Sequence, residues 1–135
     1  MSSSLNPYLA FRGQAAEAME FYRSVFGGDL TTTRFEEFGM EGAPGDWLMH
    51  AQLTTPDGYV LMGSDVPEHM PLPEGRSTIS LSGDDTEKLR GFFAALGEGG
   101  TVEMPLTPMP WGDEYGTLTD RFGVPWMANI AVPHG

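Results

Sequence analysis

The sequence predicts an α+β fold made of two β-α-β-β-β modules, and an internal repeat is the main observation behind this prediction. The aromatic pair Phe21-Tyr22 in a predicted helix returns as Phe92-Phe93 after 71 residues, and Tyr8 and Ile79 in predicted strands are separated by the same interval. Alternating strand-like segments follow each helix. One module is too small to bury its own sheet, so we expect both to form one cupped mixed sheet with helices on its convex side.

The first module is predicted to cover about residues 7–65 and to begin with a strand at 8–11. Apolar residues recur at three- and four-residue steps over 15–26, which predicts an amphipathic helix, and Gly27-Gly28 ends it. Further strands are predicted at 29–38, 47–54 and 59–64, separated by a glycine-rich loop at 39–45 and a Pro-Asp-Gly turn at 55–58.

The second module is predicted at about 77–133, after a proline-rich linker at 66–76. A strand at 77–82 precedes a helix at 86–96, whose apolar side is expected to carry Leu89, Phe92, Phe93 and Leu96. The remaining elements are a strand at 101–104, a proline-rich loop at 105–110, and a hairpin with strands at 116–119 and 124–132. Asp120 and Gly123 have the turn chemistry that joins these last two strands.

Composition narrows the class of protein. A chain of 135 residues is expected to be a single domain, 1–135. Its net charge of −12 disfavours nucleic acids and anionic membranes and suits a cationic partner. There is no cysteine, so disulfides, thiol nucleophiles and Cys-based metal sites are excluded. We see neither a signal peptide nor a stretch of transmembrane length, and we expect a cytoplasmic protein.

Several motifs resemble the vicinal oxygen chelate superfamily, which includes glyoxalase I, bleomycin-resistance proteins and extradiol dioxygenases, and within it the PhnB-like branch. The longest matching motif runs from Gly116 through Asp120-Arg121-Phe122-Gly123-Val124-Pro125-Trp126-Met127. Shorter matches are Asn6-Pro7-Tyr8-Leu9, Ala18, Phe21-Tyr22, Phe26-Gly27-Gly28, His50-Ala51 and Ser64-Asp65. The branch carries an old label as demethylubiquinone methyltransferase-like, but no strand here leads into a glycine-rich nucleotide-binding turn.

The resemblance also implies where a metal would bind. Metal enzymes of this superfamily take His or carboxylate ligands from the first, fourth, fifth and eighth strands. These positions fall near Pro7, Met62, Thr78 and Met127, none of which is a good ligand for a divalent ion. We therefore expect no metal at the superfamily position and no cofactor.

His50 is the only histidine on a predicted strand, and it is the candidate catalytic residue because imidazole can transfer protons near neutral pH. It can equally be a half-buried histidine bonded to a neighbour. The candidate ligand-binding residues combine apolar and polar side chains expected to face the cup or its mouth: His50, Met62, Ser64, Thr78, Trp111, Tyr115, Trp126, Met127 and Asn129. For Trp126, a place in the core is the alternative.

The sequence leaves three functions open. The first is metal-independent binding of a cationic or planar small molecule in the cup. The second is an enzyme of the lyase, isomerase or dioxygenase type, using His50 with Asp113 or Glu114, or a relocated divalent metal. The third is a dimeric scaffold without a ligand. We expect a homodimer, because members of the superfamily often pair and because short sheets leave strand edges that must be covered.

The segment 111–115 is predicted to form a lid at the mouth of the cup, above His50. Gly112 and Gly116 allow the backbone to bend, while Trp111 offers an aromatic face and Asp113 and Glu114 offer negative charge. An indole in this position can stack on a planar or cationic ligand. In the alternative, Trp111 covers the core or a dimer interface.

Overall fold

The computed structural model describes residues 5–39, 43–71 and 77–131, and the chain divides into two compact units, Met1–Glu74 and Gly75–Gly135. Parts of the predicted 39–45 loop, of the 66–76 linker and of the 124–132 strand lie outside the described residues, as do the end of the second module at 133 and His134 in the tail. Each unit is described by itself below.

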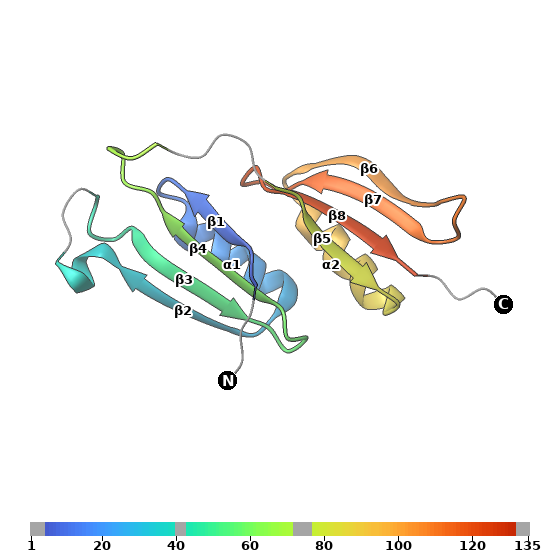
Figure 1. Ribbon diagram of the computed structural model, residues 1–135, viewed down its shortest axis with the longest axis horizontal. Coiled ribbons are helices and arrows are strands. Elements are labelled where there is room, and N and C mark those ends of the chain that lie inside the picture. Colours follow the sequence, from blue (N-terminus) through green and yellow to red (C-terminus); the bar gives the residue numbers. More distant parts are fainter. Residues whose placement is uncertain (1–4, 40–42, 72–76, 132–135) are drawn as a thin grey trace. The chain divides into compact units, whose positions relative to one another are not determined.

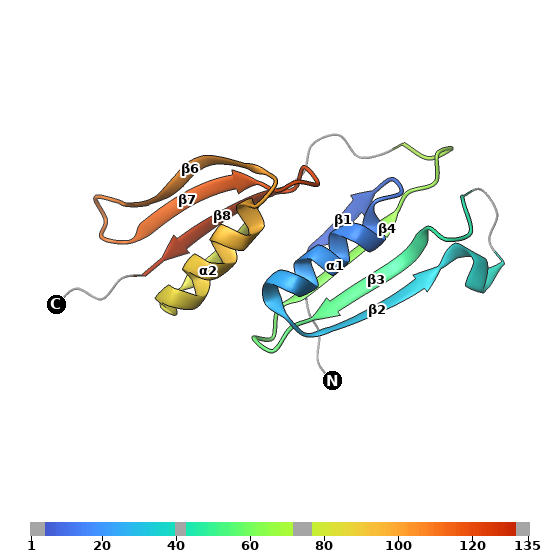
Figure 2. The ribbon, with the colours of Figure 1, turned by 180° about the vertical axis from the view of Figure 1, so that it is seen from behind.

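Unit 1 is a four-stranded sheet with one helix on it. Its elements are β1 (Tyr8–Phe11), α1 (Ala15–Phe26), β2 (Asp29–Arg34), the 3-10 helix η1 (Phe35–Phe38), β3 (Leu48–Thr54) and β4 (Val60–Asp65). The strand order is β1-β4-β3-β2, with β1 parallel to β4 and the other pairs antiparallel (Figure 1). The helix α1 covers one face of this sheet (Figure 2).

Unit 2 repeats this arrangement. Its elements are β5 (Ile79–Gly83), α2 (Thr86–Gly97), β6 (Thr101–Pro108), β7 (Glu114–Thr119) and β8 (Pro125–Ile130), and its strand order is β5-β8-β7-β6. Here β5 is parallel to β8, and α2 covers one face of the sheet (Figure 2). The predicted α+β fold with two β-α-β-β-β modules is therefore confirmed, and each module forms a four-stranded mixed sheet of its own. That the two modules together form one cup stays a prediction.

The register of the repeat differs from the prediction by one residue in the strands. Val66 N–H donates to the carbonyl of Phe11, and Ala131 N–H donates to the carbonyl of Gly83, so these positions correspond. The turn between β5 and α2 is one residue shorter than the turn between β1 and α1. Consequently, the helices keep the 71-residue interval, but Tyr8 corresponds to Ser80 and not to Ile79.

In both units, alternation along the strands separates a buried face from an open face. Under α1 the core side chains include Leu9, Phe11, Leu53, Leu61, Met19 and Tyr22, and under α2 they include Leu81, Leu118, Trp126, Ile130, Leu89 and Phe93. The alternate residues of the same strands lie on the face that the helix leaves uncovered. These open faces are therefore the part of each sheet at which a candidate site is sought.

Two predicted element boundaries were wrong. The strand predicted at 29–38 ends at Arg34, because η1 follows, with the Glu37 carboxylate accepting the backbone N–H of Arg34. The proline-rich segment predicted as a loop at 105–110 belongs largely to β6, which extends to Pro108. Prolines are tolerated there because β6 is an edge strand with two irregularities in its pairing with β7.

Gly28 and Gly100 occupy corresponding positions after the two helices, where each passes very close to a strand. A Cβ at Gly28 would lie 2.1 Å from the carbonyl oxygen of Thr54, and one at Gly100 would lie 2.3 Å from that of Thr119. Only glycine fits such an approach, which explains why the Gly-Gly pair recurs in both modules.

Candidate functional site

The open face of the unit 1 sheet carries a row of polar and thioether side chains. Tyr8 on β1 pairs with Met62 on β4, and Met62 pairs with Gln52 on β3. Ser64 is paired with Ala10, one step further along the same face. Met62, Gln52 and Ser64 are half-buried, whereas Tyr8 is 53% exposed.

Tyr8 and His50 come together on this face although they are 42 residues apart in the sequence. The Tyr8 hydroxyl lies 3.4 Å from Nδ1 of His50, and the ring centroids are 5.9 Å apart. A phenol and an imidazole at this separation can exchange or share a proton with a bound molecule. The sequence drew attention to His50 but not to this partner, because the contact depends on the pairing of β1 with β4 and of β4 with β3.

The strand register shows which residues lie beside Met62 and Met127, two of the positions near which the resemblance places metal ligands. In unit 1 the pair is Tyr8 and Met62, and in unit 2 it is Ser80 and Met127. The expected placements near Pro7 and Thr78 stay predictions, and the residues paired with the two methionines lie one and two positions further on. A phenol, a hydroxyl and two thioethers do not form the nitrogen and carboxylate set that a divalent ion prefers.

Within the described residues, no group of three or more His, Asp or Glu side chains gathers where it could hold a metal ion. This finding gives no support to a relocated metal site in that part of the chain.

Neither of the two described α-helices has the length and apolar character that crossing a membrane requires.

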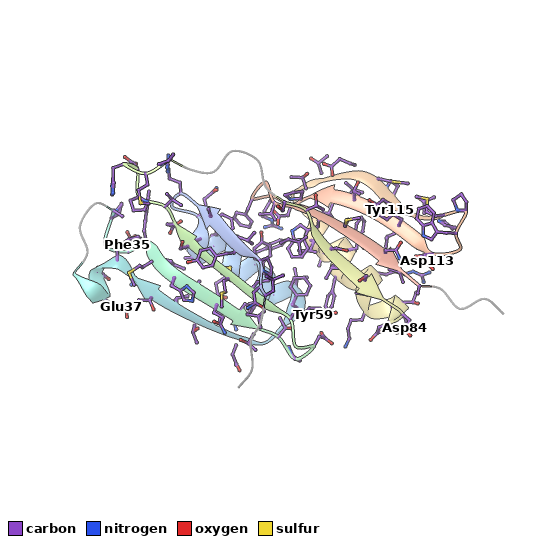
Figure 3. The ribbon with its side chains drawn as sticks, viewed as in Figure 1. Phe35, Glu37, Tyr59, Asp84, Asp113 and Tyr115 are labelled. Carbon is purple, nitrogen blue, oxygen red and sulfur yellow. The ribbon has the colours of Figure 1, made fainter. Side chains whose placement is uncertain are left out.

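Four side chains cluster at one end of the unit 2 sheet. Asn129 on β8 pairs with Tyr115 on β7, and its amide Nδ2 donates a 2.9 Å hydrogen bond to the Asp113 carboxylate. Its Oδ1 lies 3.4 Å from the indole Nε1 of Trp111. Trp111 also meets Tyr115, with ring centroids 6.3 Å apart and ring planes inclined by 69°. Figure 3 shows Asp113 and Tyr115 at this end of the sheet.

The backbone of the β6–β7 hairpin holds this cluster in place. Met109 N–H donates to the carbonyl of Asp113, and Gly112 N–H donates to the carbonyl of Met109, which closes a turn with Pro110 and Trp111 at its centre. Trp111 is 59% exposed despite its two contacts. The predicted lid segment is therefore partly strand, since Glu114 and Tyr115 belong to β7, and the position of His50 beneath it stays a prediction.

Trp126 does not belong to the open face, which corrects the prediction that it binds a ligand. It is 1% exposed and lies on the helix side of β8 together with Ala128 and Ile130. Its indole Nε1 donates a 2.9 Å hydrogen bond to Asp120. Side chains alternate between the two faces of β8, so Trp126 lies on the helix side while Met127 and Asn129 lie on the open face.

Glu114, the second acidic residue predicted to work with His50, forms an ion pair with a residue of the helix. The guanidinium of Arg90 on α2 binds its carboxylate through two nitrogens, with Nε donating over 3.0 Å to Oε1. This hydrogen-bonded pair holds the pKa of the Glu114 carboxyl below its usual value and raises the pKa of Arg90. A carboxylate neutralised in this way on the helix side is a poor partner for acid/base work with His50.

The predicted site residues thus fall into two groups, one in each unit. Unit 1 contributes His50, Met62 and Ser64, and unit 2 contributes Trp111, Tyr115, Met127 and Asn129. Thr78 is exposed and precedes β5. Sequence reasoning missed Tyr8 and Ser80 as face residues and the Asn129–Asp113 hydrogen bond. The alternation of Tyr8 and Ala10 with buried Leu9 and Phe11 was a signal that could have identified Tyr8.

Comparison with known proteins agrees with the fold. Residues 4–128 match the model of the Glyoxalase/Bleomycin resistance protein/Dioxygenase superfamily. The chain belongs to this superfamily. Proteins of this superfamily share the fold and typically bind small molecules, which differ from one protein to another.

Three members illustrate how far the likeness extends. The crystal structure of protein PA1353 from Pseudomonas aeruginosa has a TM-score of 0.87 and 36% identity, covering 98% of this chain and 100% of that one. The PhnB protein of Bacillus cereus has a TM-score of 0.74 and 27% identity, covering 96% and 100%. Protein YjdN of Escherichia coli (strain K12) is 28% identical over 138 residues, covering 93% of this chain and 94% of YjdN. The resemblance to the superfamily and to its PhnB-like members is confirmed.

Proposed function

We propose that this protein binds a small molecule on the open faces of its sheets without using a divalent metal. The observation that supports this most directly is the pair of strand contacts Tyr8–Met62 and Ser80–Met127. Met62 and Met127 lie near the positions where the resemblance implies metal ligands, and the chemistry of both pairs suits an organic molecule better than an ion. Methionine provides an adaptable apolar lining, and the neighbouring hydroxyl groups provide directional hydrogen bonds.

A thermal-shift screen of organic cations, planar aromatics and carboxylic acids, combined with metal analysis of the dialysed protein, tests this proposal. We expect at least one compound to raise the melting temperature and a metal content well below one ion per chain. Met127→Ala should weaken that compound's binding, whereas Ala94→Ser on the exposed surface of α2 should not. Stoichiometric metal that is lost on substitution of Met62 or Met127 would falsify the proposal.

Acid/base catalysis is a second candidate, and the contact between Tyr8 and His50 favours it. The relevant variants are Tyr8→Phe and His50→Gln, which remove proton transfer but retain size. If the protein is an enzyme, both variants should keep ligand binding and lose turnover of the bound compound. Retention of full turnover in both would exclude this dyad as the catalytic group.

The quaternary structure and location remain predictions of the sequence. We propose a homodimer whose sheets form cups, and light scattering at tens of micromolar tests it, since a monomer at that concentration would contradict it. The expectation of a cytoplasmic protein is likewise unchanged.

A further inference from the structure

The most organised group of aromatic and polar side chains at the open face of unit 2 is the cluster of Trp111, Asp113, Tyr115 and Asn129, of which Trp111 is exposed and the other three are half-buried. We propose that this cluster, here called the aromatic corner, binds the cationic head group of an amphiphilic organic cation such as a quaternary or protonated amine. This inference rests on the proposed small-molecule function and specifies the class of ligand.

The two aromatic rings of the corner lie edge to face and not parallel. Trp111 and Tyr115 are inclined by 69°, so their rings do not stack on each other and the indole remains available to a third group. The 59% exposure of Trp111 shows that neither contact covers it. Tryptophan is the aromatic side chain that attracts cations most strongly, because its ring face is electron-rich.

The carboxylate of Asp113 adds a full negative charge beside this aromatic surface. Its described partner is the uncharged amide of Asn129, which fixes the position of the carboxylate without neutralising it. Glu114, the next residue, is instead neutralised by Arg90. Adjacent acids therefore differ in role: Glu114 stabilises the contact between α2 and the sheet, and Asp113 is presented to a ligand.

Asn129 holds the two kinds of binding group together. Its side-chain amide donates to Asp113 through Nδ2 and faces the Trp111 indole N–H with Oδ1, so both ends of the amide are engaged. With Tyr115 as its strand partner, Asn129 connects β8 to the β6–β7 hairpin. Preorganisation of this kind reduces the entropy lost when a ligand binds.

An apolar body attached to the cation has a place on the same face. The next pair of β7 and β8 on the same face is Thr117 and Met127, and both side chains are half-buried. The thioether of Met127 can contact an alkyl or aryl group while the head group lies at the corner. The negative charge of the whole chain, −12, attracts such a cation from a distance.

Hexyltrimethylammonium and the matched pair of choline and 3,3-dimethylbutan-1-ol are suitable probes, because the last two differ chiefly in charge. Binding is followed by the indole N–H signals in NMR spectra, and the Trp111 signal is identified as the one missing from Trp111→Phe. We expect both cations to shift the Trp111 signal saturably, hexyltrimethylammonium with the higher affinity, and the neutral alcohol to leave it unchanged.

Substitutions then measure how much the indole ring and the carboxylate each contribute to binding of the cation. Trp111→Ala and Asp113→Asn should each weaken hexyltrimethylammonium binding by about three- to thirtyfold. The control Asp84→Asn makes the same change of charge at an exposed position of the same unit and should weaken it by less than about twofold. Melting temperatures of all variants show whether they remain folded, which is expected for Trp111 because it is exposed.

The two proposals fail in different ways. If no cation shifts the Trp111 signal, or if Asp113→Asn and Trp111→Ala bind the cation as the parent does, the aromatic corner is overturned. If no cation shifts the Trp111 signal but a compound from the screen binds in a manner that depends on Met127, the cation proposal is overturned and the proposed function remains intact. The proposed function itself falls if the whole screen gives no ligand, or if the protein holds stoichiometric metal that substitution of Met62 or Met127 removes.

Discussion

The indole Nε1 of Trp126 donates a 2.9 Å hydrogen bond to Oδ2 of Asp120, and both side chains are buried. The other carboxylate oxygen accepts the backbone N–H groups of Phe122 and Val124. One aspartate thereby joins the β7–β8 turn to the core face of β8. This arrangement explains why the longest motif of the sequence contains Asp120 and Trp126 six residues apart, and it assigns both residues to stability.

Replacing Asp120 by Asn should therefore destabilise the protein without affecting the open face. An amide cannot accept all three hydrogen bonds, and its own N–H groups point toward buried donors, so we expect a loss of about 2–3 kcal/mol in the free energy of unfolding. Urea unfolding followed by circular dichroism measures the change. Asp84→Asn is the exposed control and should unfold at the parental urea concentration, and an equal midpoint for Asp120→Asn would show that the hydrogen bonds contribute nothing.

In unit 1, the buried carboxylate of Asp65 likewise accepts hydrogen bonds that join separate segments of the chain. Its carboxylate accepts backbone N–H groups from Gly13, Ala15 and Leu48, at distances of 2.7, 3.0 and 3.0 Å, and thus holds the start of α1 beside the start of β3. We expect Asp65→Asn to cost about 2–3 kcal/mol and to speed hydrogen exchange of the Ala15 and Leu48 amides. Asp46→Asn, an exposed change in the same unit, is the control. Unchanged exchange at both amides would contradict this assignment.

Replacing a glycine by alanine should destabilise the protein at two positions and stabilise it at a third. Gly28→Ala and Gly100→Ala place a methyl group within 2.1 and 2.3 Å of a carbonyl oxygen, and each should cost about 3 kcal/mol or more. Gly91 is an exposed residue within α2, and a Cβ there meets nothing within 4 Å, so Gly91→Ala should instead stabilise the protein by about 1 kcal/mol. Thermal and urea unfolding of the three variants decides the point, and a stable Gly28→Ala would mean that the strand can move aside.

The ion pair between Arg90 and Glu114 predicts a specific dependence on pH. Its hydrogen bonds lower the pKa of Glu114 in the folded protein, so the stabilisation is fully present above the ordinary value of 4.5 and is lost as the pH falls through the lower folded value. Glu114→Gln should reduce stability at neutral pH and flatten its decline below about pH 4.5. Melting temperatures from pH 3 to 7 test this, and parallel curves for parent and variant would rule out a contribution from the pair.

Much of the fold could be predicted from local patterns. The two helices follow from apolar residues at three- and four-residue steps, and most strands follow from alternation between turn residues. The errors lie where tertiary pairing overrides local preference. Pro105 and Pro108 predict a loop, yet they are accommodated in β6 because an edge strand needs fewer backbone hydrogen bonds.

For the candidate site, the sequence by itself determined which chemical groups are available: no cysteine, one strand histidine, and no set of metal-ligating residues at the superfamily positions. Only the tertiary structure decided which of these groups meet. Strand pairing joins Tyr8 to His50 and Asn129 to Tyr115, and side-chain alternation sends Trp126 to the core while Met127 faces outward. The physical reason is that a shift of one residue in a strand exchanges its two faces, and contacts between distant strands fix that register.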